Sequence, residues 1–120
     1  MGGSNTASGA YALHNNTVGV SNTASGYQAL YTNATGSSNT AIGAGSLYSK
    51  STGAGNTAIG SGAFPNNTTG SYNTVIGYAA NANGGTYTNG TALGFGAYLT
   101  ASNHTTTDPS ECPTTITLPK

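Results

Sequence analysis

The chain has 120 residues, enough for one domain, and a formal net charge of zero. Charged side chains make up only 3% of it, against about 25% in ordinary soluble domains, and they are Lys50, Asp108, Glu111 and Lys120. The chain has no basic run to neutralise phosphates and no apolar run of the roughly 18 residues that a bilayer requires, so we expect neither nucleic-acid binding nor membrane insertion.

A short phrase recurs along the chain with a period of 17 residues, from Thr6 to Thr91 and from Gly9 to Gly94. No insertion or deletion interrupts this spacing. The six copies are Asn5 to Gly9, Asn22 to Gly26, Asn39 to Gly43, Asn56 to Gly60, Asn73 to Gly77 and Gly90 to Gly94. The period divides the chain into a repeat domain, 4–105, and a tail, 106–120. The repeat units are 4–20, 21–37, 38–54, 55–71, 72–88 and 89–105.

The unit length predicts the fold class. Seventeen residues are too few for a helical-hairpin repeat, and the abundant Gly, Asn, Ser and Thr disfavour helices. Short strands and tight turns suit a coil of this length, with each coil stacked on the last at about 4.8 Å. A flexible linker would have no reason to keep this phase through six units. The sequence therefore predicts an all-β, parallel β-solenoid of about six coils with an irregular C-terminal tail.

Equivalent positions of a solenoid stack into columns, and two columns are expected to be structural. One is a hydrogen-bonded asparagine ladder, in which amide bonds to amide along the stack; its members are Asn5, Asn22, Asn39, Asn56 and Asn73. The other is a column of turn glycines, where φ is positive or backbones crowd together; its members are Gly9, Gly26, Gly43, Gly60, Gly77 and Gly94. A second glycine column (Gly19, Gly36, Gly53 and Gly70) closes the other turn of the first four coils. It is replaced by Tyr87 and His104 in the last two, where we expect the stack to lose regularity.

The apolar columns leave one question open. Small residues at Ala12, Ala29, Ser46, Ala63, Ala80 and Ala97 indicate a thin coil with little interior room. Ile42, Ile59, Ile76 and Leu93 are larger, and alternation does not decide whether they point inward or outward. If they point outward, we expect the chain to be an oligomer.

These repeats resemble a known type. The phrases Asn-Thr-Ala-Ile-Gly, Gly-Tyr-Gln-Ala-Leu (Gly26 to Leu30) and Asn-Asn-Thr-Thr-Gly (Asn66 to Gly70) are similar to the head-type repeats of trimeric autotransporter adhesins. They are closer still to the related repeats of bacteriophage tail fibres and bacterial surface fibres. The resemblance covers residues 4 to 105. It implies a parallel β-roll, commonly trimeric, that serves as a stiff stalk or an adhesive head outside the cell.

Little in the sequence suggests catalysis, a cofactor or a metal. His14 and His104 lie about five coils apart, and Asp108, Glu111 and Cys112 belong to the tail. Nucleophile, base and orienting group cannot be assembled from this set, nor can clustered metal ligands. A lone cysteine excludes an internal disulfide and leaves an incidental thiol or a bridge between chains. We therefore expect no enzyme activity.

Surface functions are the remaining candidates. Six Asn-x-Ser/Thr sequons are candidate glycosylation sites: Asn15, Asn33, Asn66, Asn67, Asn89 and Asn103. Tyr27, Tyr78 and Phe95 share one column and Tyr31 and Tyr48 another; they serve either as stacking ladders or as contacts for proteins or glycans. The threonine column lacks the second column of a paired ice-binding surface, because its neighbours are Ser8, Ser25, Ile42, Ile59, Ile76 and Leu93.

The start, Met1-Gly2-Gly3, has no secretory signal character, which indicates a processed piece or another export route. The ends of the stack matter for assembly, because an open edge strand can pair with another subunit. The tail segment Thr114 to Leu118 is a candidate strand that caps the stack or adds to a neighbour's edge. We expect a non-enzymatic extracellular structural or adhesive fibre protein, on a cell surface or a virion. The alternative is a subunit that polymerises end to end, and less favoured is a glycan- or ice-binding solenoid.

Overall fold

The computed structural model describes residues 2–49 and 52–107, and these form a parallel β-solenoid without helices, as the 17-residue period predicts. No helix of these residues could therefore cross a membrane. The strands are β1 (Thr6–Ser8), β2 (Thr23–Ser25), β3 (Thr40–Ile42), β4 (Thr57–Ile59), β5 (Thr74–Ile76), β6 (Asn81–Ala82), β7 (Thr91–Leu93), β8 (Tyr98–Leu99) and β9 (Thr105–Thr107). The expected tail strand, Thr114 to Leu118, lies outside the described residues.

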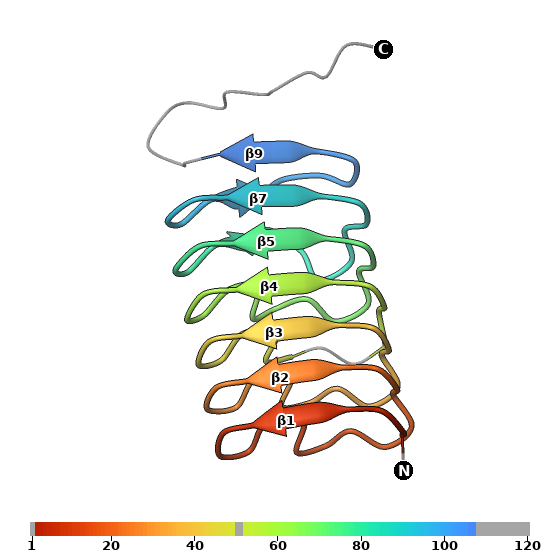
Figure 1. Ribbon diagram of the computed structural model, residues 1–120. Coiled ribbons are helices and arrows are strands. Elements are labelled where there is room, and N and C mark those ends of the chain that lie inside the picture. The colour runs from red at the N-terminus through yellow and green to blue at the C-terminus, as the bar shows by residue number, and fades with distance from the viewer. Residues whose placement is uncertain (1, 50–51, 108–120) are drawn as a thin grey trace.

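Seven of the strands stack into one parallel sheet in the order β1-β2-β3-β4-β5-β7-β9 (Figure 1). Each recurring phrase supplies one strand, and its Thr pairs with the Thr one coil later, as Thr6 does with Thr23. A second sheet, β6-β8, lies in the turn region of the last coils. Every step from β1 to β7 therefore repeats the same register, in agreement with the uninterrupted 17-residue spacing of the sequence.

The strands answer the question that the sequence left open. The middle residue of each inner strand points into the coil and is fully buried: Ala24, Ala41, Ala58, Val75 and Ala92. The residues on either side of it point outward. Ile42, Ile76 and Leu93 are accordingly 42%, 36% and 39% exposed. Side chains alternate across a strand, so this position forms the inner wall, and the thin coil fills it with alanine in all of these strands but β5, which has Val75.

The opposite wall of the coil carries the larger core side chains. Leu30, Leu47 and Phe64 are fully buried, yet their backbones are left-handed, with φ of 52°, 48° and 52°. This conformation costs roughly 1–2 kcal/mol for a residue with a Cβ. Burying such a side chain contributes about 1.5–3 kcal/mol. The free energy of burial therefore only narrowly exceeds the cost of the left-handed backbone. The turn keeps this conformation because it places the large side chain in the core of the coil.

The final coil is three residues shorter than the others. Thr91 pairs with Thr105, 14 residues on, although Ala82 still pairs with Leu99 at the 17-residue spacing, so the loss falls after Leu99. The carbonyl of His104 accepts the N–H of Thr91 at 2.8 Å. One coil earlier, the carbonyl of Gly90 accepts the N–H of Thr74 in the same way. The stack thus loses its regular spacing in the last coil, as expected, although His104 continues the asparagine column and not the second glycine column. The sheet also runs to Thr107, past the expected domain end at residue 105.

Candidate functional site

The asparagine column forms a buried ladder in the structure. Each side-chain oxygen accepts the backbone N–H of the residue one coil later, at 2.8 to 3.1 Å. Each amide nitrogen donates across its own coil to a carbonyl 14 residues on, for example from Asn22 to Gly36 at 2.8 Å and from Asn56 to Gly70 at 2.8 Å. Asn22 is 1% exposed, and the next three members are fully buried. Each asparagine side chain thus makes one hydrogen bond within its own coil and another to the next coil.

This arrangement differs from the expected chain of amide-to-amide bonds. Such bonds link only Asn56 to Asn39 and Asn73 to Asn56, both at 3.0 Å. In every member, including these two, the amide nitrogen donates to the carbonyl across the coil, since that acceptor is buried and needs a donor. The ladder is therefore mainly a link between side chains and backbone.

A second asparagine column was not predicted. Asn16, Asn33 and Asn67 donate from their amide nitrogens to Gly19, Gly36 and Gly70, at 2.9, 2.8 and 3.1 Å. Asn33 also donates to the side-chain oxygen of Asn16 at 2.7 Å. The same glycine carbonyls receive the first ladder, so two amides converge on each. The 17-residue spacing of these asparagines was the available signal, although Lys50 interrupts it in the sequence.

This second column divides the six candidate glycosylation sites. Asn33 and Asn67 are fully buried and hydrogen-bonded, so these two candidate sites are not accessible to a glycan in the folded chain. The other four asparagines, Asn15, Asn66, Asn89 and Asn103, are exposed. Among them, Asn89 donates to the side chain of Asn103 at 3.0 Å. Burial thus separates two sequons with a structural role from four accessible ones.

The turn glycines stand where two coils come into backbone contact. Their φ values run from 121° to 144°, a region that side-chain-bearing residues rarely adopt. A Cβ on Gly60 would lie 2.5 Å from the carbonyl oxygen of Gly77 in the next coil. Gly62 also has a positive φ, of 64°, yet a Cβ there would meet no atom within 4 Å. The glycine column is therefore set by the approach of neighbouring coils as well as by its own backbone angle.

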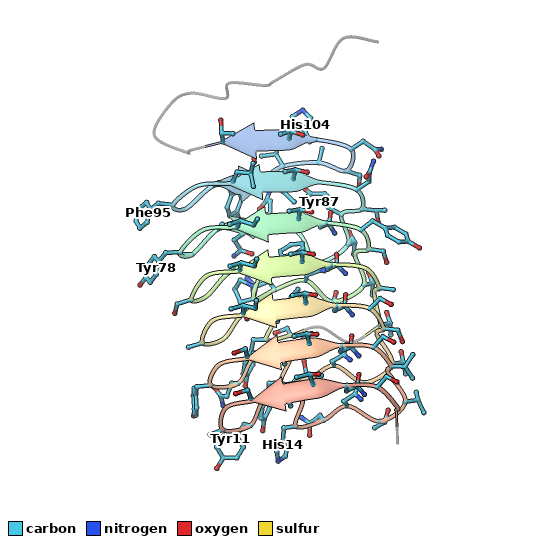
Figure 2. All side chains as sticks on the ribbon, viewed as in Figure 1. Tyr11, His14, Tyr78, Tyr87, Phe95 and His104 are labelled. Carbon is cyan, nitrogen blue, oxygen red and sulfur yellow. The ribbon has the colours of Figure 1, made fainter. Side chains whose placement is uncertain are left out.

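The aromatic columns stack as ladders, in part as expected. The rings of Tyr31 and Tyr48 are parallel at 5.2 Å, and His14 stacks on Tyr31 at 5.3 Å. Tyr78 and Phe95 are parallel at 5.8 Å and project from one edge of the stack (Figure 2). Phe95 is 73% exposed. Tyr27, which lies in the same sequence column, makes an edge contact with Tyr11 instead, at 6.0 Å.

The outer face of the seven-stranded sheet carries two columns of side chains. One is an unbroken threonine column from Thr6 to Thr105. The other begins as Ser8 and Ser25 and continues as four apolar residues, here called the apolar stripe: Ile42, Ile59, Ile76 and Leu93. Because serine or apolar residues occupy most of the second column, the sheet lacks the paired threonine surface that ice binding would require.

The histidines do not meet. Figure 2 places His14 at the N-terminal end of the stack and His104 at the C-terminal end. Among residues 2–49 and 52–107, no group of three or more His, Cys, Asp or Glu side chains comes together. What the described part of the chain offers chemically is its uncharged, regular outer surfaces and the two ends of the stack. Searches for similar proteins matched no family model, no curated protein and no solved structure.

Proposed function

We propose that this protein is a non-enzymatic structural component of an extracellular fibre, with its outer surface available for adhesive contacts. The observation that carries the proposal is the repeated coil-to-coil contact itself. The same register, the same asparagine bond and the same glycine approach recur from β1 to β7. Such a molecule is built along one axis, because each unit contacts only its neighbours. The resemblance to the repeats of tail fibres and adhesin heads supports the same role.

Composition supports an architecture that depends on backbone hydrogen bonds. All four charged residues of the chain fall outside the described positions, so the described coils carry none. Recognition by complementary charge, which steers many soluble complexes, has nothing to act on there. Contacts with a neighbour must come from backbone edges, hydroxyl groups and apolar side chains.

Lateral contact between chains is the second part of the proposal. The apolar stripe runs over four consecutive strands of a sheet, and Tyr78 and Phe95 project from the edge beyond it. A contiguous exposed apolar surface of this kind is typical of interaction sites. A second copy is the best-fitting partner, since its own stripe is uncharged and has the same strand spacing. The trimer implied by the family resemblance is one such assembly.

Immunogold electron microscopy of the source material, with antibodies raised against the folded chain, tests the fibre role. We expect gold particles along fibres outside the cell or on a virion. Labelling confined to the cell interior would refute the proposal.

A further inference from the structure

The two ends of the stack carry backbone groups whose equivalents are hydrogen-bonded in every inner coil. At the N-terminal face, made by β1 and its coil, the N–H of Gly9 has no partner among the described residues. Its equivalents Gly26 and Gly43 donate to the last residue of the preceding strand, at 2.8 and 2.7 Å. The carbonyl of Asn5 likewise receives no bond, whereas that of Asn22 accepts the N–H of Thr6 at 2.8 Å.

The C-terminal face, made by β9 and His104, carries the matching groups. The carbonyl of Thr107 occupies the strand position that accepts the glycine N–H, and the N–H of Thr105 occupies the position that donates to the asparagine carbonyl. His104 stands in the asparagine column, and its Nδ1 atom is buried without a hydrogen-bond partner. In the first five coils, from Asn5 to Asn73, the side-chain oxygen of that column accepts a backbone N–H from the next coil, at 2.8 to 3.1 Å. A buried acceptor left unmatched is costly and uncommon.

We propose that the C-terminal face of one chain binds the N-terminal face of a second copy, so that β9 of one and β1 of the other continue a single parallel sheet. Three bonds complete the junction, each repeating one already present between coils. Thr105 donates its N–H to the carbonyl of Asn5, and Gly9 donates its N–H to the carbonyl of Thr107. The N–H of Asn5 reaches Nδ1 of His104, which accepts when its imidazole is neutral with the proton on Nε2.

The side chains at the two faces favour a second copy as the occupant. Ala7 is exposed on the N-terminal face, although every equivalent residue from Ala24 to Ala92 is fully buried. Leu13 is partly exposed there, whereas Leu30, which has a coil on each side, is fully buried. A partner must therefore supply a strand in the register of β1, with no charge. The opposite end of this chain does so: Thr105 to Thr107 continue the register of the sheet, although the final coil is three residues shorter, and the described coils carry no charged residue.

The resulting contact joins unlike faces, so it does not close on itself and generates a filament. The described residues contribute seven strands to the sheet, which at about 4.8 Å per strand gives an axial repeat of about 34 Å. This inference rests on the proposed role in a fibre and adds the direction in which the fibre grows.

A matched pair of substitutions in β1 tests the junction in the full-length chain. Ala7→Lys places a charge where a second copy would bury it, whereas Thr6→Lys places the same charge on the outward face of the same strand. We expect filaments of the unmodified protein and of Thr6→Lys in electron micrographs, with a 34 Å axial repeat. Ala7→Lys should raise the critical concentration for filaments about 100-fold or more, because an unpaired charge would be buried. The melting temperature should stay unchanged, since Ala7 is exposed in the single chain.

Substitutions at His104 test the specific acceptor. His104→Asn restores the side-chain oxygen of the column and should keep the critical concentration within about threefold. His104→Leu leaves the N–H of Asn5 without an acceptor and should raise it about tenfold.

Three results would overturn end-to-end stacking: a monomer at every concentration, filaments of Ala7→Lys equal to those of Thr6→Lys, or a discrete lateral oligomer without filaments. The last of these would leave the fibre role intact, whereas immunogold labelling confined to the cell interior would refute that role even if purified chains formed filaments.

Discussion

Replacing Asn56 by alanine removes the centre of the buried ladder, and the structure shows which groups lose their partners. Asn56 accepts the N–H of Asn73 at 3.1 Å, and no other acceptor for that N–H is present among the described residues. The carbonyl of Gly70 loses a bond at 2.8 Å but keeps the one from Asn67 at 3.1 Å. The substitution therefore leaves one buried donor unsatisfied, at about 1–3 kcal/mol, and a void the size of an amide group, at about 1 kcal/mol.

The expected loss is thus about 2–4 kcal/mol, which lowers the melting temperature of a chain of this size by roughly 10 °C or more. Asn66→Ala is the matched control, because Asn66 is exposed and lies in the neighbouring turn. Thermal unfolding followed by far-ultraviolet circular dichroism measures both variants. A shift for Asn56→Ala within about 2 °C of that for Asn66→Ala would refute the idea that the ladder holds the coils together. Asn56→Asp separates the two roles of the amide, since it keeps an acceptor for Asn73 while facing the Gly70 carbonyl with a second acceptor.

Three further predictions follow from the coil contacts and the outer surface. Gly60→Ala should destabilise the chain by several kcal/mol, since its Cβ would meet the Gly77 carbonyl, whereas Gly62→Ala should cost about 1 kcal/mol or less; equal urea midpoints would contradict this. Changing Ile42, Ile59 and Ile76 together to serine should dissociate a lateral oligomer in light scattering after size exclusion while the coils stay folded; an unchanged mass would place lateral contact elsewhere. When the chain is secreted from a glycosylating host, peptide mass spectrometry should find glycan on Asn66 and none on Asn67 of the folded protein, because only Asn66 is accessible.

The 17-residue period was enough to predict the fold, because coils with the same backbone conformation need the same types of residue at equivalent positions. Thr6 and its equivalents lie in register along the sheet as their spacing requires. The period alone could not show which side of the strand faces inward, since Ala and Ile both pass as core residues. Burial decides this question, because the fully buried position of the strand wall holds alanine, with Val75 as the one larger residue among the described strands.

Two features of the candidate surfaces escaped sequence reasoning for different physical reasons. Asn33 and Asn67 match a modification signal, and such a short signal carries no information about burial. The position of His104 depends on where the last coil loses three residues, after Leu99. A deletion in a turn shifts the phase of everything beyond it, and the phase was assumed constant through residue 105. Counting from the strand of threonines, Thr105–Thr107, would have placed His104 correctly.

The shortened final coil also shows how this chain could change during evolution. The turn that carries the second asparagine column in earlier coils can lose three residues while the strand beyond it returns to the same register. Gain or loss of a whole 17-residue unit would disturb even less, since each coil bonds only to the coils above and below it. Length is then inherited as a number of units, in steps of about 4.8 Å. Unequal recombination between units of the same length and register would lengthen or shorten such a molecule without requiring any new kind of contact to evolve.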